Sequence, residues 1–165
     1  MGRKSTRENK SVYQLAREKA GLTLERAGEE MDGVTAERLQ KLESGVTRVQ
    51  PEDVLLMADC YGAPELCNQY CTHECAIGRS TMREIEIKDI SRITIETLNA
   101  LNRVSRQKDR LLEIVEDGQV CPDEKEDFLQ IKSTLDKLAA SVSSLQLWVD
   151  GQIASGKLDK QTFGK

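Results

Sequence analysis

The 165-residue sequence has few of the residues that build large sheets or membrane spans. Aromatic residues make up 4% of the chain, and proline occurs three times. A helix that crosses a bilayer needs about twenty consecutive apolar residues, and the sequence has no such run. We therefore expect no membrane partner. With 32% charged residues, the composition is typical of an all-α protein.

Signatures of export and of catalysis are missing as well. The first ten residues have no apolar core, so we expect no secretory signal and a cytoplasmic location. The chain has a single histidine, no phosphate-binding loop, no pair of carboxylates on a recognisable catalytic scaffold and no nucleophile with a partner base. The sequence therefore predicts a protein that is not an enzyme.

An overall excess of basic charge is also absent. The net charge is −4, and residues 1–79 carry 11 Lys and Arg against 13 Asp and Glu. Proteins that bind nucleic acids strongly are usually basic, because phosphate contacts supply much of their affinity. The charge is uneven, however, and residues 1–10 are locally basic. This segment is predicted to be either a flexible arm that lies along a DNA groove or an ordinary disordered terminus.

Residues 21–45 have the pattern of two short helices joined by a tight turn. Thr23 and Thr35 are good N-caps, since each hydroxyl can accept from a free backbone N–H of the first helical turn. Gly28 lets another backbone come close, and Gly33 can adopt the positive φ that ends a helix. The inner faces of the two helices carry Ala27, Met31, Leu39 and Leu42. Two capped helices at this separation indicate a helix-turn-helix, which fits the DNA major groove.

This segment resembles the DNA-binding domains of the lambda-repressor/Cro type, often called the Xre family. The residues that carry the resemblance are Gly21-Leu22-Thr23, Gly28, Met31, Val34-Thr35, Leu39, Leu42 and Glu43-Ser44-Gly45. It extends back to residues 12–20 and forward through 51–61 to about residue 75. The resemblance implies a lambda-repressor-like five-helix domain, which we place at residues 11–76, and binding to double-stranded DNA.

The second helix of the motif carries the residues predicted to contact DNA. Gln40 can read adenine, Lys41 can reach guanine or a phosphate, and Glu37 can accept from cytosine. Alternatively, Glu37 and Lys41 are an i, i+4 pair on a solvated face. The candidate DNA-binding residues are Thr35, Ala36, Glu37, Arg38, Gln40, Lys41 and Arg48, together with Arg3, Lys4 and Arg7 of the arm.

One departure from the family favours an alternative function. The family commonly has a polar residue that contacts a phosphate directly after the Leu-Thr pair, but this sequence has Leu24 there. Leu24 has no donor, Glu37 is acidic and so is the whole chain. These features favour a protein-interaction adaptor that has kept the fold and has little affinity for DNA.

Five cysteines are present, and disulfides are not expected in the cytoplasm. Cys60 is predicted to lie in the core. Cys67, Cys71 and Cys75 are spaced four apart and form one stripe on a helix, which could offer thiolates to zinc or to an iron–sulfur cluster. Alternatively, they are reduced residues on the apolar face of that helix. Ligands at i, i+4 and i+8 span about 12 Å, too far for one ion unless the helix ends near Thr72. We expect no cofactor. A thiol- or metal-responsive regulator that uses these cysteines is a further alternative for the function.

A linker at 77–83 is predicted to lead into two long helices within residues 84–155. The first helix begins at Ile87 and ends at Asp117-Gly118. The second begins near Pro122, and its apolar residues follow a heptad pattern: Phe128, Ile131, Leu135, Leu138, Val142, Leu145 and Val149. This pattern predicts a long antiparallel helical hairpin with coiled-coil packing, followed by a tail at 156–165.

The hairpin is predicted to make a homodimer, because two helices alone bury little apolar surface. Packing of the hairpin against its own DNA-binding domain is the alternative. The sequence as a whole therefore predicts an all-α, homodimeric, DNA-binding transcriptional regulator.

Overall fold

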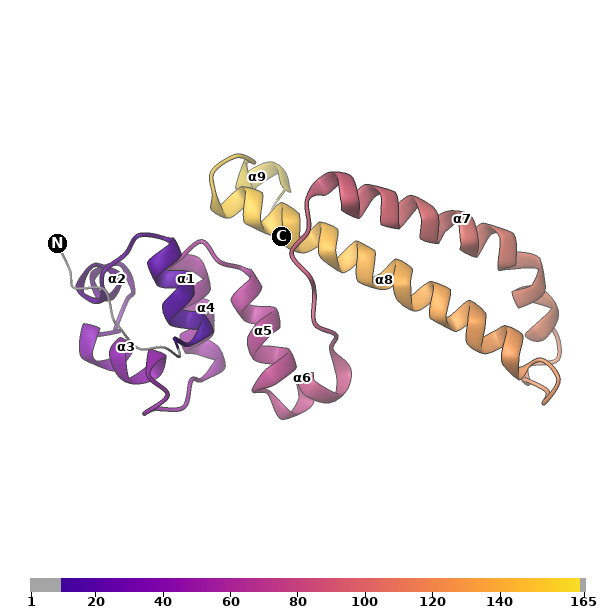
Figure 1. Ribbon diagram of the computed structural model, residues 1–165, viewed down its shortest axis with the longest axis horizontal. Helices are drawn as coiled ribbons and strands as arrows, with labels where there is room; N and C mark the ends of the chain where they lie inside the picture. The colour runs from indigo at the N-terminus through magenta and orange to yellow at the C-terminus, as the bar shows by residue number, and fades with distance from the viewer. Residues whose placement is uncertain (1–9, 164–165) are drawn as a thin grey trace. The chain divides into compact units, whose positions relative to one another are not determined.

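The computed structural model describes residues 10–163, and its regular structure over this range is entirely helical (Figure 1). This confirms the predicted all-α class with an N-terminal helix-turn-helix and long C-terminal helices. No described helix combines the length and apolarity that crossing a bilayer requires. The helices are α1 (Val12–Lys19), α2 (Leu24–Glu30), α3 (Ala36–Glu43), α4 (Pro51–Cys60), α5 (Glu65–His73), α6 (Ala76–Thr81), α7 (Ile90–Ile114), α8 (Lys125–Ala154) and α9 (Lys160–Phe163).

The described chain divides into two compact units. The first unit contains residues 10–84 and 149–163, and the second contains Ile85–Trp148. The first unit has its own apolar core, to which α1 through α5 all contribute side chains. The buried members of this core are Tyr13, Ala27, Met31, Val34, Leu39, Leu42, Val49, Val54, Met57, Ala58, Tyr61, Ala63, Leu66 and Tyr70.

Local sequence signals define where the helices of the first unit begin. The side chains of Ser11, Thr23 and Thr35 accept hydrogen bonds from the backbone N–H groups at the starts of α1, α2 and α3. Pro51 occupies the first position of α4, where the missing N–H has no intrahelical partner to lose. Caps and prolines of this kind act locally, which is why the sequence located these helices well.

The segment predicted as a linker at 77–83 instead contains most of α6. Gly78 lies against α5 so closely that a Cβ at this position would collide with the carbonyl group of Cys71. The backbone of α6 therefore packs directly on the backbone of α5. Only a glycine allows this approach, because any side chain would force the two helices apart.

The last turn of α8 belongs to the first unit, although the rest of that helix lies in the second. Gly62, at the end of α4, has a positive φ of 60°, and a Cβ built on it would lie 3.8 Å from the Cβ of Ala154. The carboxylate of Asp150 is close enough to Cys67 to contribute to the raised pKa of that thiol, after burial as the main cause. The first unit is therefore assembled from two separate stretches of chain.

In the second unit, α7 and α8 run antiparallel, and the ion pair between Arg110 and Asp127 (2.8 Å) joins them near the connecting turn (Figure 1). The predicted starts of both helices are wrong by three residues. Asp89 accepts from the N–H of Arg92 and caps α7, so the helix begins at Ile90 rather than at Ile87. Pro122 lies in the turn that precedes α8.

The face that α8 presents to α7 also differs from the predicted heptad seam. Ile131 is buried as expected, but Leu135 and Val142 are 40% and 44% exposed. Three small polar residues of α8 are buried instead, namely Thr134, Ser141 and Ser144, while α7 buries Ile93, Ala100 and Ile114. Small side chains allow the two helices to approach closely. Three residues of the predicted apolar stripe, Leu135, Val142 and Leu145, are consequently left exposed at one edge of the hairpin.

Candidate nucleic-acid interface

The turn between α2 and α3 depends on two glycines and one buried valine. A Cβ on Gly28 would lie 3.0 Å from the backbone nitrogen of Ala36 and 3.2 Å from the carbonyl oxygen of Val34. Gly33 has a φ of 73°, which residues with a side chain rarely adopt. Val34 is buried in the core between the two helices. This arrangement holds α2 and α3 in the compact relationship of a helix-turn-helix.

The inner face of α3 is fixed by apolar packing and by a buried ion pair. Leu39 and Leu42 are almost completely buried. At the end of the helix, the buried carboxylate of Glu43 accepts two hydrogen bonds from Arg17 of α1, at 2.8 and 2.7 Å. The hydroxyl of Tyr61 donates to the same carboxylate at 3.3 Å. These contacts raise the pKa of Arg17 and fix both the position and the rotation of α3.

Arg38 connects α3 to α4. Its Nη2 lies 2.6 Å from Oδ1 of the buried Asp53, whose other oxygen accepts from the backbone N–H of Gln50. The Arg38 side chain is nevertheless half exposed. Because a guanidinium has five N–H donors, Arg38 can hold this contact and still offer donors to a phosphate.

The outward face of α3 carries the residues predicted to read DNA. Glu37, Gln40 and Lys41 are exposed, and Ala36 is half-buried. Within residues 10–163, neither Glu37 nor Lys41 has an ion-pair partner within 4 Å, so the alternative i, i+4 pair between them does not form. The outward face is therefore polar, exposed and not engaged with the rest of the protein.

The other candidate residues lie around this face or outside the described chain. Thr35 uses its hydroxyl to cap α3, accepting from the N–H of Arg38 at 3.2 Å. Arg48 is exposed in the loop between α3 and α4. The arm residues Arg3, Lys4 and Arg7 lie outside the described residues.

Leu24, the departure from the family pattern, has a structural role. It is the first residue of α2, and its half-buried side chain packs against the core of the first unit. This position therefore contributes to stability and has no side-chain donor for a phosphate. The N-cap Thr23 and the backbone N–H groups of the first turn of α2 lie next to it.

Sequence reasoning missed the network of Arg17, Glu43 and Tyr61 that positions α3. Arg17 and Glu43 are 26 residues apart, and no local pattern links them. The one available signal is the position of Arg17 four residues after the core residue Tyr13, on the buried face of α1. A charged residue on such a face requires a partner, but the sequence does not indicate which one.

The cysteines do not form the predicted stripe on one helix. Cys67 and Cys71 lie on α5, but α5 ends at His73, and Cys75 is the N-cap of α6, where its sulfur accepts from the N–H of Gly78 at 3.5 Å. All three pack half-buried against the core. Burial raises the pKa of the Cys67 thiol. Among the described residues, no group of three or more His, Cys, Asp or Glu is arranged to hold a metal ion.

Comparison with known proteins identifies the class of this N-terminal region. No curated protein and no solved structure matches the chain. One family model does match, and it covers α1 to the start of α5, the same residues that position the outward face of α3. Residues 14–66 match the helix-turn-helix domain family, so this part of the chain carries a helix-turn-helix DNA-binding domain.

Proposed function

We propose that the chain acts in the cytoplasm as a transcriptional regulator of the Xre type, which binds duplex DNA as a homodimer through α3. The observation that carries this proposal is the contrast between the two faces of α3. Its inner face is locked by Leu39, Leu42 and Glu43, whereas Gln40 and Lys41 on its outer face are exposed and without partners in the described chain. A rigid helix with free polar side chains suits base readout in the major groove.

Each outward residue has a definite role in this proposal. Gln40 pairs with adenine, Lys41 binds guanine or a phosphate, and Glu37 accepts from the amino group of cytosine. Thr35 and Ala36 lie at the end of α3 that enters the groove first. Arg38, Arg48 and the arm residues Arg3, Lys4 and Arg7 are proposed to contact phosphates.

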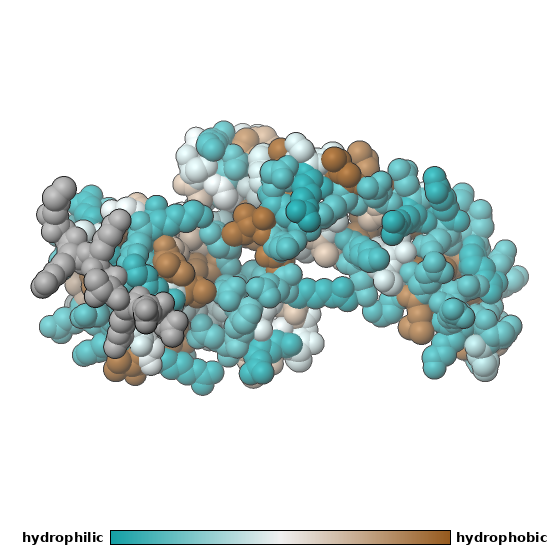
Figure 2. Space-filling view, in the orientation of Figure 1, coloured by the Kyte–Doolittle hydropathy of each residue, from teal (hydrophilic) through white to brown (hydrophobic). Residues whose placement is uncertain are grey.

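Dimerisation is supported by the apolar surface that the hairpin leaves exposed. On each long helix, large apolar residues outside the intramolecular seam remain at least 37% exposed: Leu98, Leu101 and Leu112 of α7, and Leu135, Val142 and Leu145 of α8. Figure 2 shows hydrophobic patches that interrupt the mostly hydrophilic surface of the second unit. A second hairpin would cover these residues and complete a four-helix bundle.

The dimer would also offset the weak electrostatics of a chain with a net charge of −4. Two copies present two α3 helices to successive turns of DNA, so the number of phosphate contacts doubles without any further basic residues. In this proposal the homodimer is a requirement for useful DNA affinity.

Binding to a labelled random duplex at increasing salt tests the DNA-binding proposal directly. We expect the logarithm of the binding constant to fall linearly with that of the salt concentration, with a slope of several phosphates. Selection from a randomised duplex library then gives the preferred site. Gln40→Ala should relax the preference at one base position, whereas Lys41→Ala should either relax a guanine position or reduce the salt slope by about one.

Lys125→Ala is the matched control, because Lys125 is an exposed cation of α8 without an ion pair in the described chain. It should leave both affinity and preference unchanged. Absence of binding even at low salt would contradict the proposal. It would favour the adaptor function, which the packing role of Leu24 and the exposed carboxylate of Glu37 support.

A further inference from the structure

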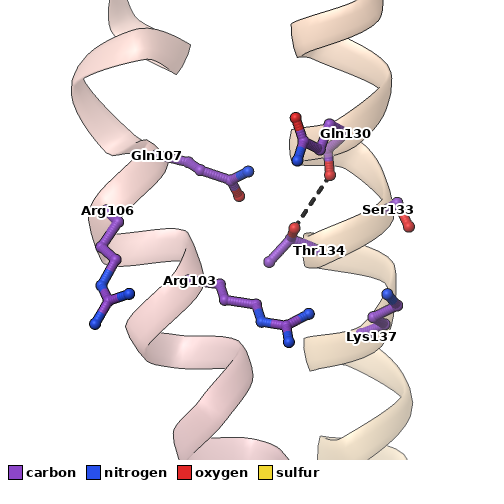
Figure 3. Close-up of a pocket in the computed structure, with 7 residues that line it drawn as sticks. All are labelled: Arg103, Arg106, Gln107, Gln130, Ser133, Thr134 and Lys137. Atoms are coloured by element: carbon purple, nitrogen blue, oxygen red, sulfur yellow. Dashed lines mark hydrogen bonds between the residues drawn. The ribbon is translucent and has the colours of Figure 1, made fainter.

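A pocket of about 450 Å³ lies between α7 and α8, within the second unit. Arg103, Arg106 and Gln107 line it from α7, and Gln130, Thr134 and Lys137 line it from α8. Figure 3 shows the side chains of Arg103 and Gln107 extending from α7 toward α8. The pocket is therefore lined by three cationic groups and by polar side chains.

The pocket is on the opposite edge of the hairpin from the exposed apolar residues. Residues two positions apart in a helix are separated by about 200° of rotation around the helix axis, so they lie on nearly opposite sides. Leu101 is two positions from Arg103, and Leu135 is two positions from Lys137. A second hairpin that covers Leu101 and Leu135 would consequently leave the pocket accessible.

The charges of the pocket differ from those of the rest of the hairpin. No carboxylate lines the pocket, and within the described chain Arg103, Arg106 and Lys137 have no ion-pair partner within 4 Å. Several other cations of the hairpin are paired at short distances. The examples are Lys88 with Glu96 at 2.7 Å, Arg110 with Asp127 at 2.8 Å and Lys132 with Asp136 at 2.9 Å.

Three unpaired cations around one pocket repel each other and create a positive local potential. Such a cluster lowers the stability of the free protein slightly and attracts anions. Guanidinium and ammonium groups make their strongest hydrogen bonds to carboxylates and phosphates. A ligand with two or more negative charges would fit this arrangement better than a single carboxylate.

One residue that lines the pocket has an unsatisfied hydrogen-bond acceptor. The Oε1 atom of Gln107 is buried, and no hydrogen-bond partner reaches it within the described chain. The neighbouring hydroxyl of Thr134 is already used, because it donates to the carbonyl oxygen of Gln130 at 3.1 Å (Figure 3). A buried acceptor without a donor destabilises the protein, so a ligand hydroxyl at this point would add to affinity.

The space available exceeds that of an inorganic anion. A second pocket of about 350 Å³ shares Arg103, Thr134 and Lys137 with the first, so the two form one groove. Its further lining includes the small residues Ala100, Ala140 and Ser141, which leave room between the helices. The carboxylate of Glu96 also lines this second part, where Lys88 neutralises it at 2.7 Å. The groove can therefore take an extended organic molecule.

We propose that this groove binds a small organic polyanion that carries at least two carboxylate or phosphate groups and a hydroxyl. Arg103 and Lys137 bind the anionic groups from the two sides, Arg106 adds a third charge, and Gln107 accepts from the hydroxyl. Neither the site nor its test depends on DNA binding. If the chain regulates transcription, this site supplies it with a small-molecule signal.

Calorimetric titration of the full chain with citrate, tricarballylate and pyrophosphate tests the site. Citrate and tricarballylate carry the same three carboxylates, but only citrate has a hydroxyl. We expect citrate to bind with a 1:1 stoichiometry per chain and several-fold more tightly than tricarballylate. Pyrophosphate separates the phosphate form of the ligand from the carboxylate form, since tighter binding of pyrophosphate than of citrate assigns the site to phosphates.

Variants separate a built site from nonspecific attraction of anions. Arg103→Gln and Lys137→Gln should each weaken citrate binding about tenfold or more, since each loses a charged hydrogen bond. Lys125→Gln removes the same charge from α8 outside the pocket and should change little. Gln107→Leu should abolish the preference for citrate over tricarballylate while tricarballylate still binds.

Three results would overturn the proposal. The first is the absence of binding heat for all three ligands, and the second is an equal loss of affinity in Lys125→Gln and Lys137→Gln. The third is a change of oligomeric state in Arg103→Gln or Lys137→Gln without ligand, which would assign the edge to a contact between copies. Circular dichroism of each variant establishes that the helices are intact.

Discussion

The guanidinium of Arg17 and the carboxylate of Glu43 meet in a buried two-point contact that joins α1 to the end of α3. The Nε–Oε1 and Nη2–Oε2 distances are 2.8 and 2.7 Å, and the side chains are only 8% and 4% exposed. The third guanidinium nitrogen of Arg17 donates to the carbonyl oxygen of Leu22, just before α2. One side chain thus connects α1, the end of α3 and the segment that leads into α2.

Glu43→Gln is expected to lower the free energy of unfolding by about 3–5 kcal/mol, because it leaves the Arg17 charge buried without a counter-charge. Urea unfolding followed by circular dichroism measures this loss. Replacing both residues together, as Arg17→Met with Glu43→Leu, should be much less harmful than Glu43→Gln alone. Arg26→Gln breaks only the exposed pairs with Glu29 and Glu30 and should cost less than about 1 kcal/mol. A similar cost for Glu43→Gln and Arg26→Gln would contradict the prediction.

Gly28→Ala is expected to destabilise the first unit by about 1–3 kcal/mol, since the added methyl group meets the backbone of the turn and cannot be relieved by moving a side chain. DNA affinity should fall as well, because α3 would shift relative to α2. The control is Gly151→Ala in α8, where a Cβ meets no atom within 4 Å. That change should instead stabilise the protein by about 0.5–1 kcal/mol. Melting temperatures of the two variants on opposite sides of the wild-type value would agree with both expectations.

The apolar edge of the hairpin is expected to determine the oligomeric state. Sedimentation equilibrium of the wild-type protein should give twice the 18.5 kDa mass of one chain. The double variant Leu135→Lys with Val142→Lys should be monomeric, because it places charges on both sides of the proposed interface. Gln130→Lys with Ser133→Lys adds the same charge to the opposite edge of α8 and should remain dimeric. A wild-type monomer at micromolar concentration would refute the proposed dimer.

All three tyrosines are expected to resist ionisation in the folded protein. Burial raises the pKa of Tyr13, Tyr61 and Tyr70, and contacts with the carboxylates of Glu74 and Glu43 raise the pKa of Tyr13 and Tyr61 further. In the unfolded chain a tyrosine ionises near pH 10. The contribution of these phenols to stability is therefore complete below about pH 10 and declines as the pH rises above it.

Absorbance at 295 nm and circular dichroism, recorded together against pH, test this expectation. Phenolate absorbance should increase only as the helical signal is lost, and Tyr13→Phe should reduce its amplitude. An increase near pH 10 while the helical signal stays constant would show that the phenols titrate freely.

The N-terminal fold could be predicted from the sequence because its signals are local. Thr23 and Thr35 act on the N–H groups three residues ahead, and Gly33 acts on its own φ. The family match over residues 14–66 agrees with this prediction. Gly78 could not be interpreted in the same way, because its importance comes from contact with the backbone of another helix. The DNA contacts of Gln40 and Lys41 stay predictions, since exposure alone does not identify what they bind.

The register of the hairpin could not be predicted because α8 carries two competing stripes. One consists of Leu135, Val142 and other large apolar residues, and the second includes the small residues Thr134 and Ser141. Hydrophobicity favours the first stripe, whereas close approach of two helices favours the second. Sequence periodicity detects only hydrophobicity. It therefore predicted that the large apolar residues form the seam, although the structure leaves Leu135 and Val142 exposed at the edge.

The assembly of the first unit from residues 10–84 and 149–163 has a consequence for synthesis on the ribosome. Translation delivers the helix-turn-helix early, but the final turn of α8, which lies against Gly62, emerges only after the whole of Ile85–Trp148 has been made. A nascent chain therefore carries an incomplete first unit until residues 149–163 have left the ribosome. A translation product that stops before residue 149 would lack the segment that completes this unit.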